Sequence, residues 1–357
     1  MFFYIGCVLI LIFLYPFFFR FNETDLRRQK RQSLLYEVIV ASILILIIGL
    51  RKETIGIDSS GYVGTFEQYS RISSERFWLR LGGFFDEPGY KILNRLIGHS
   101  LGLGYTALFL VCAIVSVAPV AVLIHKYSDR PELSWCFYLF FGFYTFCFST
   151  MRQALAMGIT VFAFMCIPQK KPIKFVLLVL LAMMFHTTSA IFLPAYCLRY
   201  FKIKWRNFAL FVIIGIFVYI FKGPIVAFLN EYSTHYYGLM DTGGINQFLF
   251  IILMCVSAIF MKEQFEEGNP INSLVYFLVA TGGAMFWMLK YNPTFFRLLN
   301  YYHLYSIIFI PNQIKAIKSQ AVRWGGAAAY LFVGAFFFYT QVLTADIKLI
   351  YYEFFWQ

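Results

Sequence analysis

Charged side chains are scarce in this chain of 357 residues, of which only 13% are Asp, Glu, Lys or Arg and only 18 are acidic. Soluble domains usually carry about 25% charged residues. Because 60% of the residues are hydrophobic and the mean hydropathy is +0.69, an ordinary soluble domain is excluded. Apolar runs of about 20 residues recur along the chain, and each can cross about 30 Å of hydrocarbon. The sequence therefore predicts an all-α polytopic integral membrane protein.

The chain also lacks the motifs of metal and redox sites. None of its seven cysteines belongs to a CxxC pair, and all lie within or beside apolar runs, as buried apolar side chains do. No DxD motif, HExxH motif or Cys/His cluster is present, so we expect neither a metal nor a cofactor. The net charge of +12 resides mostly in short loops between apolar runs, which is typical of membrane topology signals and not of nucleic-acid binding.

About twelve transmembrane helices are expected, with boundaries good to a few residues. They lie near 2–19, 35–50, 104–124, 134–150, 152–167, 175–188, 188–200, 207–222, 246–261, 272–289, 295–311 and 325–344. The first has no basic leader region or cleavage site, which predicts a retained helix. The seventh is short, and with the sixth it forms either two spans or one broken, re-entrant pair. No linker divides the chain, so residues 1–357 are expected to form a single membrane domain.

Loop charges predict the orientation of these spans. Alternate spans place five short basic segments on one side, which the positive-inside rule assigns to the cytoplasm. Both termini then face outward, together with the long loop 51–103 and segments near 223–245 and 290–297.

Polar and aromatic residues are unusually dense in the outward-facing loop 51–103. Asp58 and Tyr62 fall on one face if a helix begins at Ser59. Further along, Pro88 suits the first position of a short helix, with Glu87 just before it near the positive helix end. The loop is therefore expected to carry structured, chemically active residues and not to be a plain linker.

The short helix after Pro88 is predicted to be amphipathic. Lys91 and Arg95 are four residues apart and share one face, while Tyr90 belongs to the apolar face. Such a helix is typical of segments that lie on the membrane surface.

Arginine and histidine recur at the outer ends of later spans. Arg152 opens the fifth span, His186 ends the sixth, and Arg297 begins a stripe that continues with Asn300 and Tyr301. An unpaired charge among apolar residues costs roughly 2.5–3.5 kcal/mol on insertion scales, so Arg152 and Arg297 are expected to bind an anion or to form buried ion pairs. We expect four arginines to converge near the outer interface: Arg51, Arg95, Arg152 and Arg297.

Guanidinium groups beside carboxylates and a histidine suit a pyrophosphate that carries a sugar, because arginine presents a planar fork to phosphate oxygens. The proton of an attacking sugar hydroxyl would need a general base, and Glu87, His186 and Asp58 remain alternatives for that role. A flippase or exporter of lipid-linked oligosaccharide would also need a cationic cavity, and a membrane O-acyltransferase would also use a buried histidine. The one-sided placement of the polar residues favours chemistry on the outer face.

Five segments, in this order between about residues 49 and 311, resemble the EpsG-type, Wzy-like polymerases of bacterial exopolysaccharide and O-antigen. They are "RKETIGIDSSGYVGTF", "EPGYKILNRLIG", "MRQALAMGI", "FHTTSAIFLPAY" and "FFRLLNYYHLY". Each is short, but their shared order covers most of the chain.

The resemblance implies a multi-pass glycosyltransferase of the bacterial inner membrane with a GT-C-like fold and a periplasmic active site. Such a polymerase transfers a glycan from undecaprenyl pyrophosphate to a lipid-linked repeat unit, without a metal and with inversion. The implied partners are the undecaprenyl-pyrophosphate-linked donor and acceptor, membrane lipids and a chain-length regulator protein.

Carried over by motif, the resemblance and the residue chemistry give three groups of candidate site residues. The catalytic candidates are Asp58, Glu87 and His186. The candidates for binding the pyrophosphate are Arg51, Arg152 and Arg297. The candidates for contacting the sugar or lipid are Tyr62, Tyr90, Arg95, Asn300 and Tyr301.

Overall fold

The computed structural model describes residues 6, 14–15, 26–232, 245–286, 296–340 and 352–357. The predicted first span, 2–19, lies almost entirely outside these residues, as do most of the segment 223–245 and residues 290–295. Within the described ranges the regular elements are all helical, apart from one isolated antiparallel bridge between Arg51 and Phe354. The chain divides into two compact units, Met1–Leu193 with Ala328–Gln357 (unit 1) and Pro194–Ala327 (unit 2), and each is described by itself.

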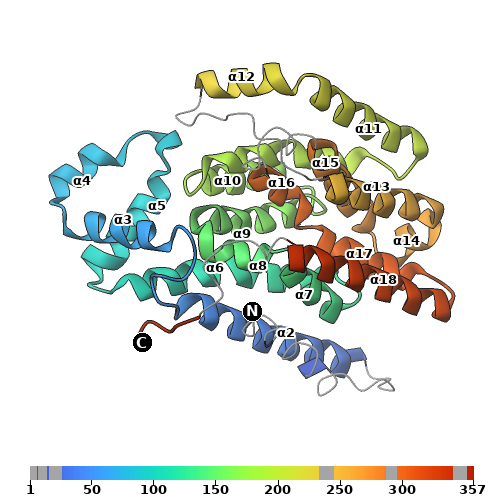
Figure 1. Ribbon diagram of the computed structural model, residues 1–357, viewed down its shortest axis with the longest axis horizontal. Helices are drawn as coiled ribbons and strands as arrows, with labels where there is room; N and C mark the ends of the chain where they lie inside the picture. The colour runs from blue at the N-terminus through green and yellow to red at the C-terminus, as the bar shows by residue number, and fades with distance from the viewer. Residues whose placement is uncertain (1–5, 7–13, 16–25, 233–244, 287–295, 341–351) are drawn as a thin grey trace. The chain divides into compact units, whose positions relative to one another are not determined.

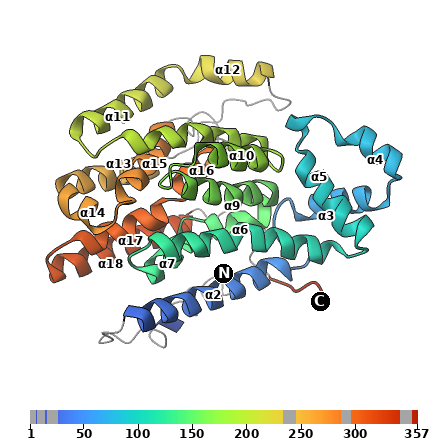
Figure 2. The ribbon, with the colours of Figure 1, turned by 180° about the vertical axis from the view of Figure 1, so that it is seen from behind.

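Unit 1 contains the long first helices, the outer loop and the helices that follow it (Figures 1 and 2). Its elements are α2 (Leu26–Gly49), α3 (Ser59–Arg71), α4 (Ser74–Leu81), η1 (Phe84–Asp86), α5 (Pro88–Arg95), η2 (Leu96–Ser100), α6 (Tyr105–Tyr127), α7 (Pro131–Phe140), α8 (Phe143–Ser149), α9 (Met151–Cys166) and α10 (Pro172–Met183). A 3-10 helix, η3 (Thr187–Tyr200), and the late helix α18 (Gln320–Phe338) contribute residues to both units.

Helices α2, α6, α9 and α10 lie side by side in that order, and the loop helices α3, α4 and α5 gather at one end of this row (Figures 1 and 2). Close approach within the row depends on glycine. A Cβ atom at Gly158 of α9 would overlap the carbonyl oxygen of Val115 in α6, and one at Gly49 of α2 would lie 2.7 Å from a methyl carbon of Leu110 in α6. The row therefore packs backbone against backbone, as small residues allow between membrane helices.

Several predicted spans are interrupted in the structure. The segment 134–150, predicted as one span, is divided into α7 and α8 because Gly142 adopts a positive φ of 78°, which ends the first helix. The sixth predicted span ends at Met183, and the segment after the break at 184–186 is the 3-10 helix η3 with Pro194 inside it. These interruptions place polar backbone and side chains at the helix ends.

Three helical segments among the described residues are long and apolar enough to cross a membrane: Arg31–Gly49, Tyr105–Tyr127 and Gln320–Phe338. A pair bent by 88°, Asn246–Phe260 and Lys262–Gly268, makes a fourth if it counts as one span. Shorter apolar helices are Met151–Cys166, Pro172–Met183, Trp205–Ile220 and Asn272–Met285. This arrangement is that of a polytopic helical membrane protein, while the total of twelve spans and the GT-C-like fold stay predictions.

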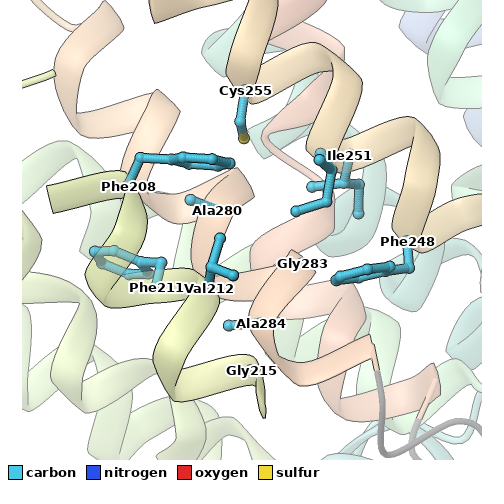
Figure 3. A pocket seen from close by; sticks show the side chains of 11 residues that line it. Phe208, Phe211, Val212, Gly215, Phe248, Ile251, Cys255, Ala280, Gly283 and Ala284 are labelled. Carbon is cyan, nitrogen blue, oxygen red and sulfur yellow. The ribbon is translucent and has the colours of Figure 1, made fainter. Parts of the chain in front are cut away.

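Unit 2 is also helical. Its elements are α11 (Trp205–Ile220), α12 (Lys222–Tyr232), α13 (Ile245–Phe260), α14 (Lys262–Gly268), α15 (Asn272–Met285), α16 (Phe296–His303) and α17 (Ser306–Ala316). Helices α11, α13 and α15 enclose a cavity of about 20 Å³ (Figure 3). Its lining is apolar and uncharged, so it suits hydrocarbon and not a phosphate group: Phe208, Phe211, Val212, Gly215, Phe248, Ile251, Ile252, Cys255, Ala280, Gly283 and Ala284.

The last residues of the chain form hydrogen bonds and an ion pair with the end of α2. The amide of Phe355 donates to the carbonyl of Leu50 at 2.9 Å, and the amide of Lys52 donates to the carbonyl of Glu353 at 3.0 Å. The Lys52 and Glu353 side chains form an ion pair at 2.8 Å, and the Tyr352 hydroxyl donates to the carbonyl of Ile47 at 2.6 Å. The C-terminal segment and the start of the loop 51–103 therefore lie on the same side of unit 1.

The packing of α6 against α9 generates a prediction about Gly158. Replacing Gly158 by Ala forces the two helices apart, and overpacking of this kind typically costs about 1–3 kcal/mol. We expect Gly158→Ala to lower the Tm of the purified protein in detergent. Gly64→Ala is the matched control, because a Cβ atom there meets nothing within 4 Å and alanine favours helix α3. An unchanged Tm for Gly158→Ala would contradict this close approach.

Candidate functional site

Glu87 occupies an unusual backbone position between η1 and α5. Its φ of 56° and ψ of 51° are left-handed, a region that residues with a Cβ atom rarely adopt. Pro88 follows at the first position of α5, and proline disfavours the right-handed helical region for the residue before it. Strained backbone of this kind is retained where the surrounding contacts over-determine it, often at functional sites.

The carboxylate of Glu87 joins three separate parts of unit 1. Its Oε2 accepts a hydrogen bond from Arg152 Nη1 at 2.5 Å. Its Oε1 lies 2.6 Å from His186 Nδ1 and also accepts a hydrogen bond from the amide of Thr187 at 3.3 Å. Both carboxylate oxygens are therefore bonded, and the outer loop is held against the start of α9 and the break between α10 and η3.

The surroundings of Glu87 keep its carboxylate ionised. Burial raises the pKa of Glu87, but the hydrogen bond and charge of His186, the charge of Arg152 and the amide of Thr187 outweigh burial and hold the pKa below the usual value of a glutamate. An ionised carboxylate only accepts hydrogen bonds, so His186 Nδ1 carries the hydrogen that lies between the two groups. In the neutral imidazole, Nε2 is then the unprotonated nitrogen with a lone pair for a proton from a substrate.

The start of α5 is pinned to the end of α10. The amide of Gly89 donates to the carbonyl of Met184 at 2.9 Å, and the amide of Tyr90 approaches the same oxygen at 3.4 Å. A Cβ atom at Gly89 would lie 2.9 Å from the Met184 side chain and 3.0 Å from its carbonyl oxygen. The glycine of the "EPGY" motif therefore permits the contact that brings Glu87 within reach of His186.

Arg152 is the most exposed of the three ionisable partners. Its side chain is 43% exposed, against 12% for Glu87 and 17% for His186. Its guanidinium lies 5.9 Å from the ring centre of Tyr90, which packs edge-on against Tyr62 at 6.0 Å. Arg152 lies in the first turn of α9 and also interacts with the side chain of Tyr62, and the exposed part of its guanidinium can reach a ligand while Nη1 holds Glu87.

Asp58 directly precedes α3, one helical turn before Tyr62, and the two are linked by a hydrogen bond from the Tyr62 amide to the Asp58 carbonyl at 3.1 Å. The helix begins at Ser59, as the sequence predicts. The Asp58 carboxylate is half-buried and has no hydrogen-bonding or ion-pair partner among the residues that the structure describes. It is therefore open to a ligand, as a catalytic or orienting role would require.

Arg51, predicted to assist in binding pyrophosphate, is instead surrounded by protein. Its side chain is fully buried and donates to the carbonyls of Ile48 at 2.8 Å, Phe148 at 3.1 Å and Ile55 at 3.3 Å. It also donates to the Ser59 hydroxyl at 3.4 Å. These contacts turn the chain from α2 into the outer loop and fix the start of α3.

Gly56 completes this turn. Its φ is +97°, and a Cβ atom there would lie 2.6 Å from the carbonyl oxygen of Phe148 and 2.8 Å from Ser59 Oγ. Only glycine fits this position, because the loop backbone passes directly over the carbonyl that Arg51 binds. Gly56 and Ser59 of the "GIDSS" segment are thus explained by packing around Arg51, whereas Asp58 is not.

Arg95 and Lys91, predicted to face the membrane surface, hold helix α4. Arg95 is buried and donates to the carbonyls of Tyr69 at 3.1 Å and Ile72, and to Ser74 Oγ at 3.0 Å. Lys91 Nζ donates to the two carbonyls at the end of α4, those of Arg80 at 3.2 Å and Leu81 at 2.9 Å. The cationic face of α5 therefore packs against protein, while the position of α5 at the membrane surface stays a prediction.

The remaining three candidates belong to α16 in unit 2. Arg297 is exposed, whereas Asn300 and Tyr301 are each 1% exposed and form part of the buried core of that unit. Arg297 belongs to unit 2 and Arg152 to unit 1, and the convergence of the two stays a prediction. The burial of Asn300 and Tyr301 leaves Arg297 as the exposed member of the predicted stripe.

Two groups of the site cannot be predicted from residue types because they belong to the backbone: the amide of Thr187 and the carbonyl of Met184. The "EPGY" glycine is the one sequence signal for the second contact, because an obligatory glycine indicates close backbone approach. No group of three or more His, Cys, Asp or Glu side chains that could hold a metal ion occurs in the described part of the chain.

Comparison with known families covers nearly the whole chain. The model of the EpsG family matches residues 34–354, a range that contains every candidate site residue. No curated protein and no solved structure matches the chain.

The burial of Arg51 predicts that a cation alone cannot replace it. Lysine offers three donors from a single point, so Arg51→Lys leaves buried carbonyls without a partner, at about 1–3 kcal/mol for each. We expect a clearly lower Tm in detergent. Arg71→Lys is the control, because that side chain is 78% exposed. If Arg51→Lys kept the Tm and lost only substrate binding, Arg51 would be a ligand for pyrophosphate.

The hydrogen bonds of Glu87 predict a pH-dependent contribution to stability. A carboxyl whose pKa is depressed in the folded state stabilises the fold above its unfolded pKa, and this contribution is lost as the pH falls through the folded pKa. We therefore expect Glu87→Gln to lower the Tm at pH 7, and the difference from the wild-type protein to shrink as the pH falls below 4.5. The measurement is a thermal unfolding series in detergent, and a difference that is constant with pH would contradict it.

Proposed function

The chain belongs to the EpsG family, and from that premise we propose that it polymerises lipid-linked oligosaccharide repeat units on the outer face of the bacterial inner membrane. Membership of this family implies a Wzy-like polysaccharide polymerase, a glycosyltransferase in its type of chemistry. In the proposal the donor is a glycan on undecaprenyl pyrophosphate, and the acceptor is a second lipid-linked repeat unit. The observation that carries the assignment of residues is the Glu87 carboxylate, which holds His186 and Arg152 at one place.

We assign the general base to His186 and an orienting role to Glu87. The carboxylate is bonded at both oxygens and its pKa is lowered, so it is a weak proton acceptor. Its hydrogen bond with Nδ1 fixes the ring and turns Nε2 into the acceptor, the same division of roles as between carboxylate and imidazole in serine hydrolases. Asp58 is the second acidic group of the proposal and orients a sugar hydroxyl.

Arg152 is assigned to the pyrophosphate of the donor. Its guanidinium is half exposed, adjoins the base and stays protonated, so it can stabilise the charge that develops on a departing phosphate. Arg297 of unit 2 is proposed as a second cation for the same group. Arg51 and Arg95 are given positioning roles, because their N–H groups are bonded to protein carbonyls and hydroxyls.

The proposed reaction is a single displacement. A hydroxyl of the acceptor sugar attacks the anomeric carbon of the donor, while the bond from that carbon to the phosphate oxygen breaks. The bonding electrons leave with undecaprenyl pyrophosphate beside Arg152, and the hydroxyl proton passes to His186 Nε2. Attack from the face opposite the leaving group inverts the anomeric configuration. Tyr62 and Tyr90 are buried, so their proposed role is to support the guanidinium of Arg152 from within the core and not to form a surface for the sugar.

Substitutions at His186 and Arg152 test this proposal. We expect His186→Ala to lower kcat by about 10²–10⁴ with little change in KM, since a general base acts on the chemical step. Arg152→Ala should lower kcat by about 10²–10³, and Arg152→Lys should recover only part of it. The measurement is the length of the glycan ladder that purified protein makes from one defined undecaprenyl-linked repeat unit.

Arg206→Ala is the control for these variants, because Arg206 is an exposed residue at the start of α11. Its ladder should equal that of the wild-type protein. Ladders of wild-type length from both His186→Ala and Arg152→Ala would refute the assignment. Movement of the lipid-linked unit across vesicles without any polymer would instead identify a flippase.

A further inference from the structure

We propose that the end of α4 together with η1, residues 78–85, inserts into the lipid interface of the outer membrane leaflet and holds Glu87 at the level of the lipid headgroups. This surface, the α4–η1 apolar tip, consists of Trp78, Leu79, Phe84 and Phe85. The lipid contact does not depend on the proposed polymerase activity, whereas its consequence for Glu87 does.

The α4–η1 apolar tip contains the most exposed large apolar side chains of the loop 51–103. The exposed fractions are 84% for Leu79, 74% for Phe85, 65% for Trp78 and 38% for Phe84. Four large apolar side chains within eight residues would be unfavourable in water, and contiguous exposure of this kind marks an interaction site. The neighbouring Phe77 is 3% exposed and packs inward, so α4 has a definite protein-facing side.

The tip is held in a fixed shape. Arg95 binds the turn before α4, and Lys91 binds the last two carbonyls of the helix. After Gly82, whose φ is +75°, the amide of Gly83 donates to Asp86 Oδ2 at 2.6 Å, which closes the η1 turn. The apolar side chains are thus presented by a rigid element, as insertion requires.

Polarity changes along the length of α4. Its first turn, with Glu75 and Arg76, lines an open polar depression of about 630 Å³ shared with Glu67, Gln68 and Arg71 of α3. Its last turn and η1 carry the apolar side chains, with Arg80 beside them. Arginine next to tryptophan and phenylalanine is typical of the membrane interface, where the guanidinium reaches the phosphates and the rings lie below them.

The position of α4 in unit 1 favours lipid over other occupants. The loop that carries it connects the ends of two apolar helices, α2 and α6, and α4 is the outermost helix of that loop in both views (Figures 1 and 2). The tip protrudes, whereas ligand sites for sugars and other small molecules are concave. An anionic lipid headgroup also complements Arg76 and Arg80.

Insertion of the tip would set the height of the Glu87 carboxylate that orients the proposed base. Phe85 is two residues before Glu87, and the η1 turn connects them directly. The pyrophosphate of a membrane-anchored substrate lies at headgroup level, so a tip anchored about 5–10 Å into the headgroup and acyl boundary would keep Glu87 and its partners at the depth of the scissile bond.

Fluorescence of Trp78 in vesicles tests the lipid contact without any enzyme assay. The full-length protein is reconstituted in vesicles of phosphatidylcholine and phosphatidylglycerol, and the contribution of Trp78 is the difference between wild type and Trp78→Phe. We expect this contribution to be strongly quenched by acyl chains brominated near the glycerol, less by chains brominated near the methyl end, and weakly by aqueous iodide. Quenching by iodide alone would overturn the proposal, because the tip would face water.

Protection of Trp78 from both quenchers would also overturn it, because the tip would then be covered by protein, for example a second copy of the chain. Leu79→Asp is the second variant, and we expect it to reduce lipid quenching of Trp78 because a charge disfavours burial in lipid. Ser60→Asp adds the same charge at an exposed position of α3 and should leave the quenching unchanged. Equal quenching in Leu79→Asp and Ser60→Asp would contradict insertion of the tip.

Discussion

The carboxylate of Glu87 is the constraint on which the rest of the candidate site depends. It accepts hydrogen bonds from Arg152, 65 residues away along the chain, and lies against His186 and the amide of Thr187, 99 and 100 residues away. A largely buried carboxylate without these partners would be costly, and so would the guanidinium and imidazole without it. The loop 51–103, the start of α9 and the break after α10 are therefore stabilised by one shared set of contacts. The contacts that define the candidate site are thus also tertiary contacts of unit 1.

Helix interruptions create the space for these contacts. Glu87 lies between two helices in a left-handed conformation, and His186 lies in the break between α10 and η3. An unbroken membrane helix satisfies its own backbone groups and leaves none for such contacts. Here the freed carbonyl of Met184 binds the start of α5, and the freed amide of Thr187 binds Glu87. The polar site is therefore concentrated where regular helix stops, and the same interruptions shorten several apolar helices in the described part of the chain.

Local patterns in the sequence predicted the membrane class, the starts of α3 at Ser59 and α5 at Pro88, and the membership of the family, because each follows from neighbouring residues alone. The sequence predicts that Glu87 and His186 lie on the same side of the membrane but not that they pair, because residues 99 positions apart give no periodic signal. Arg51 and Arg95 could not be distinguished from ligand-binding arginines, because their acceptors are backbone carbonyls supplied by the tertiary fold. Helical spacing identified a cationic face on α5 but not the helix that covers it.

The pairing of Glu87 with Arg152 has a consequence for the binding of the proposed substrate. One carboxylate and one guanidinium in contact largely neutralise each other. A diphosphate ester would bring a negative charge on each phosphoryl group, and in surroundings of low dielectric that excess charge is costly unless it is matched. Binding of the proposed donor would therefore require a second cationic side chain besides Arg152, so electroneutrality would limit which anions the site accepts.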